Sequence, residues 1–173
     1  MPNARPRSGR KRGPERVFFP VPGHDHARCA IDAMAHAEAR CCERERRLTP
    51  IRRQVLAALA ASHQPLGAYE IIDRLARTGH RLAPITVYRA LDFLLGVGLV
   101  HRIESRNAFL ACINNHDSGS PVVFLICERC GAVGEAPSPA VANALRDAAT
   151  GAGFVAKTPV IEITGVCSTC RAS

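Results

Sequence analysis

Apolar residues recur at helical spacing through the first half of the chain. Residues 27–46 mix apolar and charged side chains in the pattern of an amphipathic helix. Three shorter helices are expected at 50–62, 69–77 and 84–95. Thr49 stands at the N-cap position before Pro50. Each helix therefore has one apolar face that can pack into a shared core.

A pair of strand-like runs follows these helices. Residues 99–103 and 108–112 flank the polar turn 104–107, which predicts a hairpin. Helices followed by a hairpin are typical of a winged helix-turn-helix, a DNA-binding fold. If Glu104 pairs with Asn107, His101 faces Leu110, and Cys112 is its diagonal neighbour on the same face of the hairpin.

The pattern changes after the polar residues 114–120. Strands are expected at 122–126, 132–135 and 160–166, and Ser138-Pro139 should begin a helix that ends at Gly151. The inward side of that helix is expected to carry Val141, Leu145 and Ala149. The fold class is therefore α+β. We expect a basic, non-periodic tail at 1–23, a winged-helix domain at 24–107 and a small α/β domain at 108–173.

The distribution of charge favours a polyanionic partner for the first half of the chain. The formal net charge is +8. The tail has six Arg or Lys against one Glu, residues 24–107 have thirteen Arg against nine acids, and residues 108–173 have four basic side chains against five acidic ones. A basic excess of this kind fits DNA binding, although a solvated arginine-rich surface would give the same count. On the predicted third short helix, the outward face offers Thr86, Tyr88, Arg89 and Asp92, which suits a recognition helix in the major groove.

The chain contains eight cysteines, and their chemistry depends on whether the protein lies in an oxidising or a reducing compartment. A disulfide scaffold is rejected, because the chain is long enough for a hydrophobic core and no secretory signal is visible: the short run Val17–Phe19 is broken by Pro20. A reducing, cytoplasmic location is expected, where paired cysteines act as metal ligands or redox thiols. The sequence contains no apolar run that approaches the length of a membrane span, so no membrane association is expected.

The strongest chemical signal is a pair of CxxC motifs. Cys127 and Cys130 form the first pair, and Cys167 and Cys170 form the second. Two pairs of this spacing can hold one ion in closed, tetrahedral, all-sulfur coordination, which is typical of structural zinc. Unrelated buried thiols are the alternative, but packing alone rarely produces two matched pairs. A dithiol redox enzyme is disfavoured, because neither pair opens a helix after a parallel strand.

A second set of candidate ligands consists of His101, Cys112, His116 and Glu135. Nitrogen, sulfur and oxygen donors together suit zinc and disfavour hard ions such as Mg²⁺. Taken singly, a histidine on a wing or a glutamate on a strand is usually a surface residue, so the interpretation depends on the combination. Located between the two domains, this site would couple metal binding to their relative orientation.

Other candidates carry weaker signals. The residues His24, His26 and Cys29 could form a third metal site or simply precede the first helix. The neighbours Cys41 and Cys42 point to different faces of a helix, so we expect one core thiol and one surface thiol.

Several motifs together resemble the ferric uptake regulator family, and within it the zinc uptake regulator branch. The motifs are RLTPIR at 47–52, AYE at 68–70, PITVYRALDFL at 84–94, GLVHRIES at 98–105, NAF at 107–109 and FLICERCG at 124–131. The resemblance covers roughly residues 27–170. It implies a winged-helix domain joined to an α/β dimerisation domain with zinc knuckles, and a homodimer that represses zinc-import genes by binding double-stranded DNA.

The resemblance also implies roles for particular residues. The structural zinc ligands would be Cys127, Cys130, Cys167 and Cys170, and the regulatory ligands His101, Cys112, Glu135 and a loop histidine, here His116. The loop departs from the family pattern, since several relatives carry more than one histidine there. The DNA-contacting positions would be Tyr69, Tyr88 and Arg89, and Arg52 and Thr86 are further candidates for DNA contact.

Three other functions fit the sequence less well than a zinc-dependent repressor. An iron or peroxide sensor of the same family is the near alternative, but a cysteine among the sensor ligands favours a softer ion. A zinc hydrolase or thiol enzyme would need an open metal position beside a general base, and no HExxH or nucleophile motif is present. A zinc-ribbon interaction module without DNA binding does not explain the basic first half.

Overall fold

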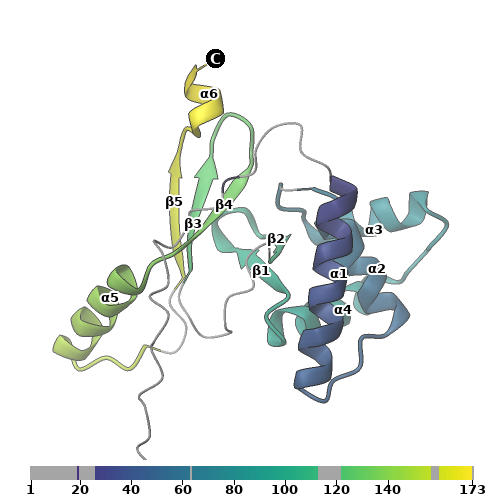
Figure 1. The fold of residues 1–173 in the computed structure, drawn as a ribbon, viewed down its shortest axis with the longest axis horizontal. Helices are drawn as coiled ribbons and strands as arrows, with labels where there is room; N and C mark the ends of the chain where they lie inside the picture. The colour runs from purple at the N-terminus through teal and green to yellow at the C-terminus, as the bar shows by residue number, and fades with distance from the viewer. Residues whose placement is uncertain (1–18, 20–25, 63, 113–121, 157–159, 173) are drawn as a thin grey trace, which may run out of the picture.

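Four helices and a hairpin form the N-terminal lobe of the computed structural model, which describes residues 19, 26–62, 64–112, 122–156 and 160–172 (Figure 1). The helices are α1 (His26–Glu43), α2 (Pro50–Ala60), α3 (Ala68–Arg77) and α4 (Pro84–Gly96). Each lies where the apolar period predicts it, within a few residues at either end. Thr49 is the N-cap of α2 and Pro50 begins the helix, although the threonine side chain makes no capping hydrogen bond.

The core of this lobe is made by the apolar stripes of α2, α3 and α4. Leu56, Ile71 and Leu91, one from each helix, are at most 1% exposed. Burial of each such side chain stabilises the fold by about 1.5–3 kcal/mol. Helix α1 lies across α2, and Arg40 at its end donates from Nε to the carbonyl oxygen of Val97, 3.4 Å away, just beyond α4.

The wing is a two-stranded antiparallel sheet of β1 (Val100–Ile103) and β2 (Ala108–Ala111), joined by the 3-10 turn η1 (Glu104–Arg106). The predicted register is confirmed, since His101 pairs with Leu110. Asn107 closes the turn with φ of 46°, a left-handed conformation that asparagine tolerates better than most residues.

The two faces of the wing belong to different cores, because neighbouring strand residues point to opposite sides. Val100 and Phe109 pack into the helical core. Ile103 and Leu110 pack instead against the sheet of the second lobe, in a separate apolar cluster. The wing therefore lies between the two lobes, as Figure 1 shows.

The second lobe is a three-stranded sheet with two helices. Its elements are β3 (Val122–Cys127), β4 (Val133–Pro137), α5 (Pro139–Gly151), β5 (Ile161–Gly165) and α6 (Ser168–Ala172). Strand β3 is central, antiparallel to β4 and parallel to β5. The short helix α6 was not predicted from the sequence. The α+β architecture with an N-terminal winged helix is confirmed.

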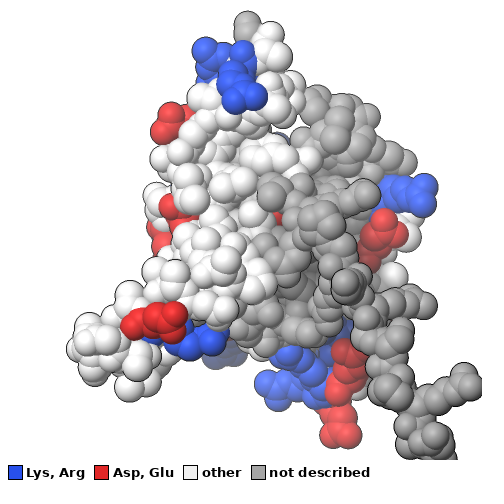
Figure 2. Space-filling model, turned by 60° about the vertical axis from the view of Figure 1, so that its left-hand side comes forward, with Lys and Arg blue, Asp and Glu red and all other residues white. Residues whose placement is uncertain are grey.

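The prediction for the inward side of α5 is wrong within this chain. Val141 and Leu145 are 38% and 42% exposed, and only Ala142 is buried among the residues of the helix. The reason is that α5 projects away from the sheet that precedes it (Figure 1). Figure 2 shows that the broad face presented by this lobe is largely free of charged side chains.

The pairing of β1 with β2 crosses the expected domain boundary between residues 107 and 108. Because the hairpin is one sheet, β2 belongs structurally with the winged helix. Across the described ranges, none of the helices combines the length and the apolar character that crossing a membrane requires.

Candidate metal centres and nucleic-acid interface

The four cysteines of the two CxxC motifs come together at one end of the second lobe. They are Cys127 and Cys130 at the end of β3 and in the turn after it, and Cys167 and Cys170 at the start of α6, and their sulfur atoms all lie within 4.8 Å of one another. The Sγ atoms of Cys130 and Cys167 are 3.9 Å apart. A tetrahedral zinc–sulfur site with bonds of about 2.3 Å requires sulfurs about 3.8 Å apart. The spacing therefore fits structural zinc without rearrangement of the backbone.

The backbone around these cysteines favours the ionised form of at least one thiol. Hydrogen bonds from the backbone N–H groups of Cys130 and Cys167 lower the pKa of Cys127 to about 6. The hydrogen bond with Cys167, followed by burial, raises the pKa of Cys170 to about 12. A divalent ion that binds thiolates would displace the protons from these closely spaced thiols. All four cysteines are free of disulfides.

The turn that holds the first pair depends on a glycine. Gly131 has φ of +74°, a conformation that other residues rarely adopt, and its N–H donates to the carbonyl oxygen of Cys127 at 3.0 Å. The second pair is tied to the first by Arg129, which donates to the carbonyl oxygen of Cys170. We use the name tetrathiol knuckle for residues 127–131 with Cys167 and Cys170.

A second cluster lies between the two lobes. His101 on β1, Cys112 just after β2 and Glu135 on β4 place one ring nitrogen, one sulfur and one carboxylate oxygen within 4.8 Å of one another. His101 Nε2 is 3.9 Å from Glu135 Oε1. We call these three residues the junction cluster. Its residues come from both lobes, as the sequence predicted.

Local structure explains how the junction cluster is assembled. Strand pairing places His101 beside Leu110 on the face of the wing that meets the sheet, and Cys112 is held by a 3.0 Å hydrogen bond from its N–H to the carbonyl oxygen of Leu99. The His101 ring lies 5.2 Å from that of Phe124, measured between centroids. Phe124 in turn pairs with Glu135.

Burial gives the junction cluster its chemical character. Glu135 is 0% exposed and Cys112 is 8% exposed. Placing a carboxylate in such an environment costs free energy unless a cation or hydrogen-bond donors compensate it. Nitrogen, sulfur and oxygen donors that converge in a buried site fit a zinc ion bound at the boundary between the lobes.

Two of the candidate histidines, His24 and His116, lie outside the residues that the structure describes. His26 begins α1 and Cys29 is half-buried on the same helix. Cys41 is buried and Cys42 exposed, which confirms their different faces.

Four of the expected DNA-contacting side chains lie on α3 and α4 and reach solvent to different degrees. Tyr69 on α3 is 69% exposed and Tyr88 on α4 is 39% exposed. Arg89 is also exposed and Thr86 is partly exposed. The N-terminal half of α4 therefore presents an aromatic and a cationic side chain toward solvent, as base-edge and phosphate contacts require.

Arg52 has a different setting from these residues. Its guanidinium carbon lies 3.4 Å from the centre of the Phe93 ring, and its Nη1 donates to the carbonyl oxygen of Arg47 at 2.5 Å. The side chain thus joins α2 to α4 through a cation–π contact. This packing role was not predicted from the sequence.

Two further residues, Ile85 and Glu162, have positions that suggest a role and were not predicted as site residues. Ile85, 59% exposed, lies on the same side of α4 as Tyr88 and Arg89, and the spacing of three and four residues could have found it. Glu162 on β5 contacts the wing turn, and no sequence signal indicates this, because it depends on how β5 pairs with β3.

Comparison with known proteins agrees with this description. A family model described as the ferric uptake regulator family matches residues 43–164. The zinc uptake regulation protein of Escherichia coli (strain K12) is 37% identical over 139 residues, which cover 80% of this chain and 81% of that protein.

Solved structures give the same likeness in three dimensions. A structure described as a zinc uptake regulator complexed with zinc and DNA has a TM-score of 0.78 and 36% identity, covering 83% of this chain and 95% of that one. The crystal structure of holo XcZur has a TM-score of 0.76 and 40% identity, covering 83% of this chain and 99% of that one.

Proposed function

The chain belongs to the ferric uptake regulator family, and we propose that within it the protein is a zinc-responsive, DNA-binding transcriptional repressor that controls zinc-uptake genes. It is a transcription regulator rather than an enzyme. The observation that carries the proposal is the junction cluster, a buried set of zinc-type donors drawn from both lobes. We propose a cytoplasmic location, where its cysteines stay reduced.

We propose two zinc sites per chain with different tasks. Cys127, Cys130, Cys167 and Cys170 would hold the structural ion. This site would tie the C-terminal helix α6 to the end of β3, so its ligands contribute directly to the folding of the second lobe. Four protein ligands leave no open position for catalysis.

The regulatory site would consist of His101, Cys112 and Glu135, with His116 as the proposed fourth ligand. A bound zinc ion supplies positive charge that compensates the buried carboxylate and thiolate. His101 and Cys112 move with the wing, whereas Glu135 moves with the sheet. Simultaneous ligation by all three residues therefore requires the orientation of the lobes that this structure shows.

The fixed orientation matters because a dimer must present two recognition helices at a spacing that matches the DNA repeat. When the lobes adopt this orientation only part of the time, the apparent affinity for DNA is reduced by the fraction of molecules that have it. We propose Arg52, Tyr69, Thr86, Tyr88 and Arg89 as the DNA contacts. Arg89 is the candidate for base readout, and residues 1–23 would add contacts to phosphates.

The protein acts as a homodimer, and we propose that the second lobe forms its interface. Ile163 on the edge strand β5 is 52% exposed. The other exposed apolar residues of this lobe lie on α5, between α5 and β5, and just after β5: Val141, Leu145, Phe154, Val155, Val160 and Val166. Apolar groups in such number on one lobe mark an association surface. We propose that the domain boundary lies after the hairpin, because β2 pairs with β1.

A family member that senses iron or peroxide is the alternative. The sulfur donor of Cys112 argues against it, because thiolate ligands favour zinc over the harder ferrous ion.

The test is operator binding by the purified dimer across a range of buffered free zinc. The operator is a duplex selected from a random library by the zinc-loaded protein. We expect tight, sequence-specific binding only above a threshold of free zinc, with one ion per chain retained below it. Binding that responds to ferrous iron and not to zinc would refute the proposal.

A further inference from the structure

The sheet of the second lobe presents two carboxylates to the wing, one on each side of Phe124. Strand pairing aligns Glu135 on β4, Phe124 on β3 and Glu162 on β5. Residues paired in this way share a face of the sheet. Glu135 belongs to the junction cluster, whereas the proposed function gives Glu162 no role.

Glu162 makes two hydrogen bonds to the turn of the wing. Its Oε1 accepts from the backbone N–H of Glu104 at 2.6 Å, and its Oε2 accepts from that of Ser105 at 3.2 Å. These N–H groups open the 3-10 turn η1, where they have no partner within the turn. A carboxylate at the N-terminal end of a helical turn is favourable, and hydrogen bonds to a charged acceptor are stronger than neutral ones.

The side chain of Glu104 does not compete for these donors. Its Oε2 lies 3.2 Å from Nε of Arg102, and that arginine also donates to Oδ1 of Asn107 at 2.9 Å. The turn is thus held internally by one acidic residue and externally, from the other lobe, by Glu162.

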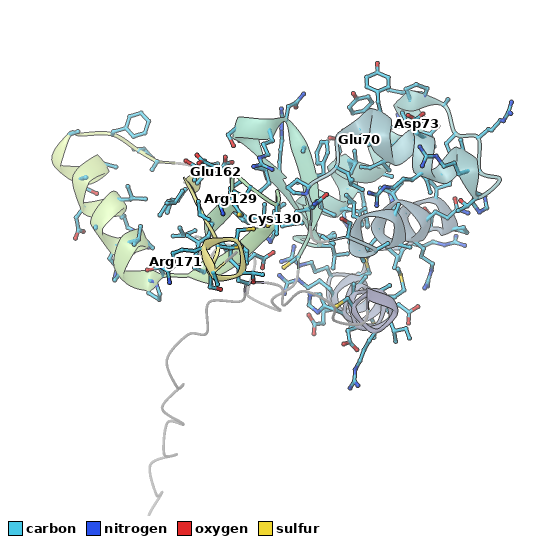
Figure 3. All side chains as sticks on the ribbon, turned by 90° about the horizontal axis from the view of Figure 1, so that it is seen from above. Glu70, Asp73, Arg129, Cys130, Glu162 and Arg171 are labelled. Atoms are coloured by element: carbon cyan, nitrogen blue, oxygen red, sulfur yellow. The ribbon has the colours of Figure 1, made fainter. Side chains whose placement is uncertain are left out.

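Further contacts between the lobes lie at the tetrathiol knuckle. Gln64 donates from Nε2 to the carbonyl oxygen of Cys130 at 2.7 Å, and Arg106 donates from Nη1 to that of Gly131 at 3.4 Å. A β-carbon at Gly131 would come within 3.6 Å of Arg106 and 3.7 Å of Gln64. Figure 3 shows Cys130 and Glu162 in the region between the two lobes.

The chain positions Gln64 for this contact through a backbone bridge. Leu66 pairs with Phe109 of β2, with reciprocal N–H to carbonyl hydrogen bonds of 2.8 Å. The segment that carries Gln64 is therefore attached to the wing and moves with it. The hydrogen bonds of Gln64 and Glu162 connect the same two bodies that the junction cluster connects.

We propose that Glu162 is a positioning residue that holds the wing against the dimerisation sheet without a metal, and that Gln64 and Arg106 assist it at the tetrathiol knuckle. The inference rests on the proposed function and deepens its regulation. These contacts join the lobes in the orientation shown here, which the proposed function assigns to DNA binding, so they raise the population of that orientation before zinc arrives. They therefore set how much free zinc the switch requires.

The test compares Glu162→Gln with the matched control Asp147→Asn on α5. The two variants remove one negative charge each from the same lobe, and the Asp147 side chain is exposed and makes no interlobe contact among those described. Removing a negative charge should by itself strengthen binding to the negatively charged DNA. An amide keeps one acceptor oxygen in place of two carboxylate oxygens, so at least one charged hydrogen bond is lost.

We expect the free-zinc midpoint for operator binding to rise about 5- to 20-fold in Glu162→Gln and to stay at the wild-type value in the control. The salt dependence of operator binding should not change, because no phosphate contact is lost. Gln64→Ala should also raise the free-zinc midpoint for operator binding.

A second measurement reports on the contact itself. Hydrogen exchange of the Glu104 and Ser105 amides should accelerate about tenfold in Glu162→Gln, and not in the control. Equal zinc midpoints for Glu162→Gln and Asp147→Asn, with a normal wild-type response, would overturn the positioning role and leave the proposed function intact. A wild-type protein that shows no zinc response would overturn both. Accelerated exchange with an unchanged midpoint would show a contact without a positioning role, and the inference would be wrong.

Discussion

Replacing Cys112 by serine is the sharpest test of the junction cluster. The side chain is 8% exposed and its sulfur lies within 4.8 Å of a ring nitrogen of His101 and a carboxylate oxygen of Glu135. Serine is nearly the same size, so the surrounding apolar contacts should persist. Its hydroxyl is not ionised at neutral pH and binds zinc far more weakly than a thiolate. We therefore expect the fold, the dimer and the tetrathiol zinc to be retained.

The magnitude follows from what ligands contribute to a metal site. Removing an outer partner of a ligand costs about 10- to 100-fold in metal affinity, so losing the thiolate itself should cost at least about 100-fold. Zinc binding and operator binding are linked through the orientation of the lobes, so the free-zinc midpoint for DNA binding should rise by a similar factor. A full switch from 1% to 99% of the competent orientation needs about 10⁴-fold preferential binding, which a site weakened in this way no longer supplies.

The assay is fluorescence anisotropy of a labelled operator duplex in buffered zinc, with metal content measured on the same samples. Cys42→Ser is the matched control, because that thiol is exposed on α1 and belongs to neither cluster. We expect wild type and Cys42→Ser to coincide, and Cys112→Ser to bind operator only at much higher zinc. Coincidence of all three curves would refute the regulatory assignment. Loss of the tightly held zinc from Cys112→Ser would refute the separation into two sites.

Three further outcomes are expected. Cys127→Ser should lose the tightly held zinc and the dimer, because structural zinc supplies about 10–16 kcal/mol to folding; zinc analysis and gel filtration check this, and a soluble dimer with unchanged zinc would contradict it. Arg89→Ala should lose about 1–3 kcal/mol of discrimination between operator and random duplex, whereas removing the arginines of residues 1–23 should weaken both duplexes alike and lower the salt dependence. Equal weakening by Arg89→Ala would argue against base readout. Leu145→Asp, on the exposed side of α5, should raise the dimer dissociation constant at least about tenfold by sedimentation, with Asp147→Asn on the same helix as the control. An unchanged dimer would place the interface elsewhere.

Features that depend on short stretches of chain were predictable from the sequence. The helices α2 to α4 follow from apolar periodicity, and α2 and α4 also from proline at their first positions. The wing register follows from its four-residue turn, which fixes His101 opposite Leu110. The CxxC spacing predicts which cysteines come together in each pair, because two thiols separated by two residues converge within one turn. In each case the partners lie close together in sequence, so local geometry alone determines their relation.

Features that depend on contacts between distant segments of the chain were decided by the tertiary structure. Glu162 contacts the wing only because β5 pairs with β3 in one register, although residues 128–160 separate the two strands along the chain. A shift of one residue would turn its side chain to the other face. The apolar side of α5 was predicted to face inward, yet periodicity shows only that a helix has an apolar face and not whether its own chain or a partner covers it. Burial of Glu135 likewise results from the packing of two lobes, which no local pattern encodes. The sequence alone determined which residues could bind zinc and DNA, and the tertiary structure decided how the two lobes are held together, because contacts between remote segments depend on the whole set of packing interactions.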